Sequence, residues 1–340
     1  MREFRLRTRN LLLNVLGLSP VPVLWARLVR ARDLVLCLHN VVERHGPLGT
    51  NRGLDLTLRD LQMLIQFLLG AGYHPATLDE IVLRIESGDR LSDCRFAITF
   101  DDGYAGVFHV AHPLLHHYGV PFTIYVTTGF MDRSVCVWWY ALERLLAAVD
   151  HVAFEHAGRT HVLSTSTIAQ KLRAYRAIRA LLLQAPASSA DELLQQLFQG
   201  RVHDLSGLGA GDMLTPKQVS QLSRDPLVTI GGHSVSHPVL RELTAEDSRQ
   251  EISACRERLE AVTGRSVRHF AYPFGNRVAF GPREEQLVRE TGYVTATTTR
   301  ARRLRPTDRL TALPRVMLTA ELDVIVALRA LMTGWFGHGA

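Results

Sequence analysis

Seven short apolar runs recur along the chain, and most of them are separated by stretches with helical periodicity. Runs of this length that are apolar at nearly every position are typical of strands buried on both faces of a parallel sheet. Alternating strands and helices predict that this sheet is closed or nearly closed, with functional residues after the carboxyl ends of its strands. The runs cover residues 34–38, 96–100, 121–126, 227–230, 267–272, 293–297 and 310–316.

Two of the intervening helices have clear start and stop signals. Residues 57–71 begin at Thr57, a favourable N-cap, and end near two glycines. Residues 245–263 are preceded by Thr244 and followed by Gly264, so we expect a long helix there.

The region from about 138 to 225 interrupts this alternation. Its apolar periodicity at 139–149, 168–184 and 191–199 predicts a mostly helical insertion that covers one side of the core. Trp138 and Trp139 at its start could stack on sugar rings, but packing is the simpler interpretation because most tryptophans bury area.

Composition predicts a globular protein with a sizeable core. The chain has 340 residues, 46% of them hydrophobic, and a net charge of +6. Residues 1–32 hold seven arginines and one acid, so the rest of the chain sums to zero. A nucleic-acid face on the main body is therefore not indicated, although arginines at 300, 302, 303 and 305 form a local basic patch.

Residues 1–32 combine their arginines with an apolar stretch at 11–18. An amphipathic segment on an anionic membrane explains this pattern, and a helix packed on the body with a solvated basic face explains it equally well. A secretory signal fits poorly, since 24–26 make a poor cleavage site. Four widely spaced cysteines suggest apolar fillers in a reducing compartment. We therefore expect a cytoplasmic protein, with peripheral contact to the inner face of the membrane through residues 1–32 as a further expectation.

The candidate chemistry begins where the run at 96–100 ends. Asp101 and Asp102 follow it directly, and Gly103 lets the backbone turn. Asp-Asp-Gly alone is also a common turn sequence, but a charge at the end of a buried strand needs a partner. Neighbouring strand residues point to opposite sides, so we expect the two carboxylates to have different roles.

A second polar motif follows the apolar run at 227–230. It brings His233 and His237, which with Asp102 would form a two-histidine, one-carboxylate metal site. His112 and His116 have the same spacing on a predicted helix, where we expect them to face solvent.

These two motifs resemble those of a known family. Thr99-Phe-Asp-Asp-Gly103 and His233-Ser-Val-Ser-His-Pro238 are similar to the first two motifs of the polysaccharide deacetylases, the NodB-homology or carbohydrate esterase 4 family. The segment from Tyr104 to Phe130 is also similar, and the resemblance covers roughly residues 34–318. It implies a distorted (β/α)7 barrel of parallel strands that hydrolyses N-acetyl groups on amino sugars.

The resemblance also implies roles for the motif residues. A divalent metal, which we expect to be Zn²⁺ with Co²⁺, Ni²⁺ or Mn²⁺ as alternatives, would be held by Asp102, His233 and His237. It would polarise the acetyl carbonyl and lower the pKa of its bound water. Asp101 matches the general base that deprotonates this water.

The third family motif, usually Arg-x-x-Pro-Tyr, departs from its pattern here. Ala271 stands at the arginine position and Phe274 at the tyrosine position. The backbone N–H of Phe274 can still stabilise the oxyanion, because this role needs no side chain. We predict that Arg315, at the end of the last strand, replaces the missing arginine that orients the base.

The general acid also lies elsewhere in this chain. The family takes it from a C-terminal Leu-x-His motif, which is absent here, whereas the poly-N-acetylglucosamine deacetylase branch takes it from the first strand. Leu36-Cys-Leu-His39 is similar to that arrangement. We assign His39 as the acid, the alternative being that it only ends a strand.

The domain organisation expected from these patterns is a basic N-terminal segment (1–32), a deacetylase barrel (33–318) with its insertion, and a C-terminal helix and tail (319–340). The expected function is N-deacetylation of a bacterial surface polysaccharide or its lipid-linked precursor. The expected partner is thus an N-acetylated glycan or lipid-linked saccharide, and not nucleic acid. Three alternatives stay open: a glycolipid deformylase, a catalytically silent carbohydrate-binding relative, and a basic membrane or nucleic-acid adaptor.

Overall fold

The computed structural model describes residues 33–88, 93–185, 187–201 and 205–319. The predictions for the basic segment 1–32 and for a C-terminal helix lie outside the described residues, apart from residue 319. None of the helices in the described part of the chain is long and apolar enough to cross a membrane.

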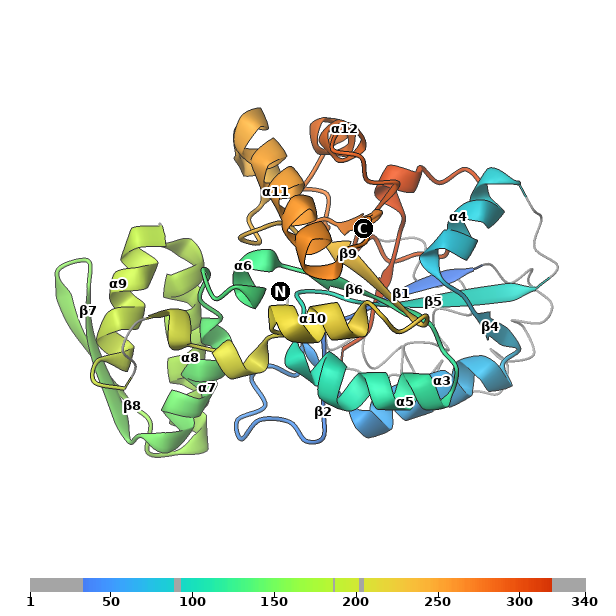
Figure 1. The fold of residues 1–340 in the computed structure, drawn as a ribbon. Helices are drawn as coiled ribbons and strands as arrows, with labels where there is room; N and C mark the ends of the chain where they lie inside the picture. Colours follow the sequence, from blue (N-terminus) through green and yellow to red (C-terminus); the bar gives the residue numbers. More distant parts are fainter. Residues whose placement is uncertain (1–32, 89–92, 186, 202–204, 320–340) are drawn as a thin grey trace.

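All seven predicted strands have counterparts in one curled, parallel sheet (Figure 1). Its order is β11-β10-β9-β6-β5-β1-β12, and a further short strand, β4, pairs with β5. The strands are β1 (Leu34–Leu38), β4 (Tyr73–Pro75), β5 (Cys94–Phe100), β6 (Phe122–Val126), β9 (Val228–Gly232), β10 (His269–Ala271), β11 (Thr295–Thr297) and β12 (Val316–Met317).

The segment before β12 brings the two edges of the sheet together. Thr297 and Leu313 form a parallel bridge. The N–H of Leu313 donates to the carbonyl of Ala296 (2.9 Å), and its own carbonyl accepts from the N–H of Thr298 (2.8 Å). The fold is thus a distorted (β/α)7 barrel, as predicted.

The last apolar run differs from the prediction in its length as a strand. Residues 310–316 contain the short 3₁₀ helix η5 (Leu310–Ala312), and regular pairing begins only at Val316. Pro314 lies between them and has no N–H to donate to a neighbouring strand, so it interrupts the ladder.

Helices surround the sheet as the alternating pattern predicts (Figure 1). The predicted caps are confirmed. Thr57 and Asp60 form a capping box at the start of α3, and α11 runs from Thr244 as N-cap to Gly264, where φ is 66°. These helices are α3 (Leu58–Gly70), α4 (Leu78–Glu86), α5 (His112–His117), α6 (Thr128–Met131), α10 (Pro216–Leu222), α11 (Ala245–Thr263) and α12 (Pro282–Glu290). A short π-helix, η1 (Val107–Ala111), leads into α5.

The insertion forms a lobe beside α6 (Figure 1) with an apolar core of its own. Its three predicted helical periods correspond to α7 (Trp138–Ala148), α8 (Ile168–Gln184) and α9 (Ala187–Phe198). The expectation of a mostly helical region misses the hairpin of β7 (His151–His156) and β8 (Arg159–Ser164). Its two-residue turn, Ala157 and Gly158, has positive φ at both positions, which suits a tight hairpin.

Candidate active site

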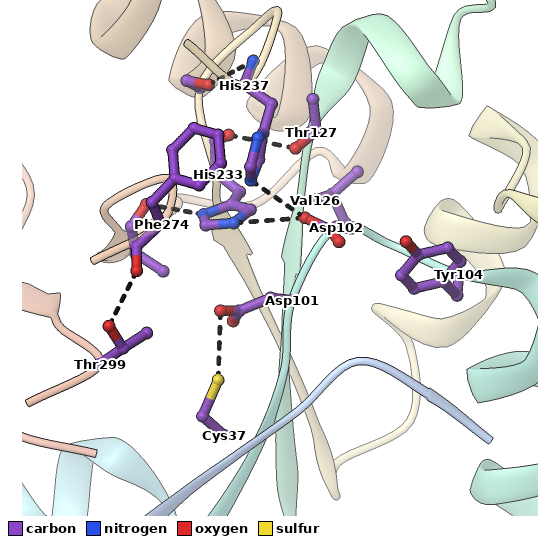
Figure 2. Close-up of polar contacts among 12 residues, drawn as sticks. Cys37, Asp101, Asp102, Tyr104, Val126, Thr127, His233, His237, Phe274 and Thr299 are labelled. Carbon is purple, nitrogen blue, oxygen red and sulfur yellow. Dashed lines mark hydrogen bonds and ion pairs between the residues drawn. The ribbon is translucent and has the colours of Figure 1, made fainter. Parts of the chain in front are cut away.

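The residues singled out from the sequence meet at the carboxyl ends of the strands. Asp101 and Asp102 follow β5, His233 and His237 follow β9, and Phe274 follows β10. The side chains of the two aspartates face different groups: Asp102 faces the histidines, whereas Asp101 faces Cys37 (Figure 2). Asp101 also faces Arg315, which lies just before β12 and not, as expected from the sequence, at the end of the last strand. The two adjacent carboxylates therefore point to different groups, and their different roles stay a prediction.

Asp102 and the two histidines converge on one point. Oδ1 of Asp102 lies 3.4 Å from Nε2 of His233 and 3.3 Å from Nε2 of His237. Nδ1 of His233 lies 2.7 Å from the carbonyl of Ala271, which can only accept, so this nitrogen is the donor. In the neutral ring Nε2 then presents its lone pair to Asp102, whose Oδ1 is buried without a hydrogen-bond partner.

This donor set fits a metal ion. Acceptor atoms that face one another in a buried site need a cation between them, and two imidazoles with one carboxylate suit Zn²⁺ and related divalent ions. Burial opposes protonation of His237, and although Asp102 counteracts it the pKa falls to about 4, so this ring is neutral near pH 7. Burial also opposes ionisation of Asp102, but the facing imidazoles of His233 and His237, together with that of His39, hold the pKa of Asp102 well below its usual range.

Asp101 is held by a buried arginine. Arg315 is fully buried and donates from Nη1 to Oδ1 of Asp101 (2.6 Å) and from Nη2 to Oδ2 (2.7 Å). Its remaining donors reach the hydroxyl of Thr99 (2.9 Å) and the carbonyl of Thr298 (3.1 Å). Burial would raise the pKa of Asp101, but the positive charge and hydrogen bonds of Arg315, together with His233, hold it at about 2. Arg315 therefore contacts both oxygens of Asp101.

Cys37 and His39 complete the surroundings of Asp101. The thiol of Cys37 lies 3.4 Å from Oδ2 of Asp101, and burial keeps the thiol protonated by raising its pKa. Ligand-type atoms of Cys37, His39 and Asp101 lie within 4.8 Å of one another, and Nδ1 of His39 is buried without a partner. The structure thus brings His39 to the site. All four cysteines are free, but Cys37 is more than the apolar filler suggested by the sequence.

Phe274 lies on the other side of the histidines (Figure 2). Its ring centroid is 4.8 Å from that of His237, and its side chain is 48% exposed, so the ring forms part of the rim. None of the described residues accepts a hydrogen bond from its N–H, which leaves this donor available to a substrate.

Residues from neighbouring elements brace the motif loops. The hydroxyl of Thr127, after β6, donates to the carbonyl of His233 (3.1 Å). Glu251 on α11 accepts from the N–H groups of Val235 and Ser236. Sequence reasoning missed both braces, because a lone Thr and a lone helical Glu carry no motif.

The insertion also reaches this site. Asn40, next to His39, donates from Nδ2 to Asp55 (3.0 Å) and to the hydroxyl of Tyr140 on α7 (3.3 Å). Nε1 of Trp139 donates to the hydroxyl of Tyr104 (3.1 Å), two residues after Asp102. Trp139 therefore packs against the site.

The second histidine pair lies apart from the candidate metal ligands. Nε2 of His112 is 2.8 Å from Asp225, whereas the side chain of His116 is 63% exposed. The expectation of solvent-facing histidines is met by His116, and His112 is instead partly buried against Asp225.

The fold and the site together define a barrel of parallel strands with a candidate metal-ligand triad and a separate carboxylate at the strand ends. A family model described as polysaccharide deacetylase matches residues 89–296, more than half of the chain. The chain therefore belongs to the polysaccharide deacetylase family and is a hydrolase of the polysaccharide N-deacetylase class. No curated protein sequence matches the chain.

Solved structures with this fold come from several bacteria. The deacetylase PplD of Streptococcus pyogenes, solved with acetate, has 15% identity and a TM-score of 0.60, with 89% of this chain and 99% of that chain covered. IcaB from Ammonifex degensii has 18% identity and a TM-score of 0.57, covering 88% and 97%. The BpsB deacetylase domain from Bordetella bronchiseptica has 16% identity and a TM-score of 0.53, covering 84% and 95%. At these identities the similarity shows the fold.

Proposed function

We propose that this protein is a metal-dependent hydrolase that removes N-acetyl groups from amino sugars of a bacterial surface polysaccharide or of its lipid-linked precursor. The observation that carries the proposal is that the two adjacent carboxylates contact different groups. Oδ1 of Asp102 faces two histidine nitrogens, whereas both oxygens of Asp101 are held by Arg315. A purely carbohydrate-binding protein has no need for this arrangement.

Asp102, His233 and His237 would hold the metal, with Zn²⁺ expected and Co²⁺, Ni²⁺ or Mn²⁺ as alternatives. When bound, such an ion supplies a Lewis acid for the amide carbonyl and lowers the pKa of water. Asp101 then accepts a proton from the attacking water, which forms the new C–O bond. Arg315 keeps the Asp101 carboxylate ionised and fixed in orientation.

The other two groups act on the tetrahedral intermediate. The N–H of Phe274 donates to the oxyanion, since it has no acceptor among the described residues. His39, beside Asp101, donates a proton to the sugar nitrogen as the C–N bond breaks, releasing acetate and a free amine.

The test is acetate release from N-acetylglucosamine oligomers and from lipid-linked saccharides, with metal content measured on the same samples. We expect metal-dependent release by the wild type and none by Asp101→Asn with its metal retained. Asp132→Asn, which alters an exposed carboxylate paired with Arg258, is the matched control and should keep its activity.

Other outcomes would change the assignment. Formate release from N-formylated sugars without acetate release would make the protein a deformylase. Bound metal with no hydrolysis of either amide would favour a carbohydrate-binding protein. A folded protein that binds none of the four metals would contradict the proposal at its centre.

A further inference from the structure

Each of three neighbouring strands is followed by a segment that carries an arginine, at the edge of the barrel where the candidate site lies. Arg241 lies in the short 3₁₀ helix η4 (Leu240–Glu242) after β9, Arg277 in the loop after β10, and Arg300 in the loop after β11. We call these three residues the rim arginines. Since β9, β10 and β11 are adjacent and parallel, their loops leave the sheet side by side at the substrate-facing edge.

Hydrogen bonds connect the segments that carry the rim arginines with one another and with the candidate site. The hydroxyl of Thr299 donates to the carbonyl of Phe274 (2.8 Å), and its N–H donates to the carbonyl of Gly275 (2.9 Å). Nη1 of Arg241 donates to the carbonyl of Arg277 (3.3 Å). Phe274 therefore contacts the metal-ligand group through its ring and the loop of Arg300 through its backbone (Figure 2).

The rim arginines have no acidic partners among the described residues. Residues 274–309 contain eight arginines and four acidic residues. Each of these acids is already paired: Glu284 with Arg283, Glu285 with Arg309, Asp308 with Arg302, and Glu290 with Arg249. Positive charge therefore remains uncompensated beside Phe274.

Arg300 shows this imbalance most clearly. Its guanidinium lies 4.9 Å from the ring centroid of the buried Phe280, and its Nε is buried without a hydrogen-bond partner. Burial and the positive charges of Arg277, Arg309 and Arg302, offset only by Glu285, lower its pKa. An anion bound there would satisfy the unpartnered donor and relieve the repulsion between like charges.

We propose that the rim arginines bind a phosphoryl group of the substrate, so that the protein acts on a phosphate-bearing amino-sugar glycan in preference to a neutral one. Guanidinium groups bind phosphate oxygens in pairs, and a phosphate offers more oxygens and more charge to three arginines than a carboxylate does. This inference rests on the proposed deacetylase function and names its substrate class. The phosphate could belong to a lipid-linked saccharide or to a phosphorylated polysaccharide.

The experiment compares two substrates that differ only in the phosphate: an N-acetylglucosamine trisaccharide and the same trisaccharide with a 1-phosphate. We expect the metal-loaded wild type to have the higher kcat/KM on the phosphorylated substrate, by an amount that falls as KCl is added. In Arg277→Gln combined with Arg300→Gln, the loss on the phosphorylated substrate should exceed the loss on the neutral one by about a hundredfold, or about tenfold for each arginine.

Two further variants test whether misfolding or a general loss of positive charge explains the result. Arg277→Gln alone changes an exposed side chain and should give about a tenfold difference even if Arg300 is needed for folding. Arg224→Gln removes the same charge from an exposed position before β9, at the opposite end of the barrel, and should leave the substrate preference unchanged.

The outcomes separate this inference from the proposed function. Equal kcat/KM for the two substrates in the wild type, or equal losses in the double variant, would overturn the inference while the deacetylase stands. If neither substrate is hydrolysed, the deacetylase proposal fails. The inference is then judged by calorimetric titration with N-acetylglucosamine 1-phosphate, where binding that is absent or unchanged in the double variant overturns it.

A third substrate distinguishes the sources of the phosphate. This substrate is the same trisaccharide attached to a polyprenyl diphosphate, in detergent. If the natural substrate is lipid-linked, the kcat/KM of this third substrate should be higher than that of the soluble 1-phosphate. Equal values would support recognition of the phosphate alone, as in a phosphorylated polysaccharide.

Discussion

Arg315 offers the sharpest test of how the site works, because its guanidinium is fully buried and both oxygens of Asp101 depend on it. In Arg315→Ala, the Asp101 carboxylate would stay buried with only the Cys37 thiol as a side-chain partner. Removing one member of a buried ion pair costs about 3–5 kcal/mol, which is a large part of a typical unfolding free energy of about 5–15 kcal/mol. We therefore expect a folded but markedly less stable protein.

The effect on catalysis should be separable from the effect on stability. General-base catalysis contributes about 10²–10⁴ in rate, so loss of the fixed carboxylate should lower kcat by about a hundredfold or more. Metal content should not change, since none of the hydrogen bonds of Arg315 goes to Asp102, His233 or His237. Arg315→Lys keeps the charge but not the paired geometry, so it should fall between the wild type and Arg315→Ala.

The assay combines urea unfolding, metal analysis and acetate release per folded molecule. Arg84→Ala is the matched control, because Arg84 pairs with Asp33 (3.0 Å) and Asp93 (2.9 Å) near the start of the sheet strands. It should lower stability but keep kcat. Wild-type kcat in folded Arg315→Ala would refute the orienting role, and loss of metal in that variant would show that Arg315 shapes the metal site instead.

Three further predictions concern other parts of the molecule. Chelation should abolish acetate release and Zn²⁺ should restore it, whereas Asp102→Asn should lower metal content and stay inactive when Zn²⁺ is added; restored activity in this variant would contradict its assignment as a ligand. Tyr140→Phe removes the 2.5 Å hydrogen bond to buried Asp55, so unfolding should become easier by about 1–3 kcal/mol, and an unchanged urea midpoint would show that this contact contributes nothing. Burial opposes ionisation of Asp225, but hydrogen bonds from His112 and from the N–H of Leu227 lower the pKa of Asp225 below its ordinary value. The contribution of the ionised carboxylate to stability is therefore present above the ordinary pKa and is lost as the pH falls through the lower folded pKa. The difference in Tm between wild type and Asp225→Asn should therefore shrink below about pH 4, and a constant difference would exclude this origin.

Much of the barrel could be predicted from the sequence because its strands are buried on both faces. A run such as Phe96 to Phe100 has no charged residue, and its single polar residue, Thr99, is β-branched and itself favours a strand. The three-residue strand β4 carries no such signal, since Tyr73–Pro75 is short, polar at its centre and ends in proline. The hairpin in the insertion was missed because its apolar alternation is short: only Val152 and Phe154 of β7 are buried, and β8 has no buried residue.

The candidate site was partly visible for a related reason. Motifs at strand ends meet wherever parallel strands share an edge, so Asp102 and the two histidines could be grouped in advance. Cys37 could not, because a single cysteine in a buried strand has the composition of core. Cys37 lies in β1 two residues before His39, which follows the strand, and the β1–β5 register pairs Cys37 with Thr99, two residues before Asp101. The register between two strands is set by the tertiary structure and cannot be read from the sequence of either strand alone.

The backbone at the site explains why two consecutive aspartates can serve different groups. Asp101, just after β5, is still hydrogen-bonded to β1, since its N–H donates to the carbonyl of Leu38 (2.9 Å), and its carboxylate faces Arg315. Asp102 has a left-handed φ of 69°, so the chain leaves the strand there and its carboxylate turns to the histidines.

Left-handed backbone conformations of non-glycine residues recur in the other loops of the site. Ser234, His237 and Phe274 also have positive φ, and with Asp102 they are four of the six non-glycine residues with this conformation among the described residues. Such conformations cost about 1–3 kcal/mol each and persist where surrounding contacts enforce them. Here the N–H of Thr127 donates to the carbonyl of Asp102 (3.3 Å), and the hydroxyl of Ser234 accepts from the N–H of His237 (2.9 Å). The barrel therefore stabilises strained loops that bring the candidate metal ligands and Phe274 together, and the periodicity of the sequence gives no indication of these loop conformations.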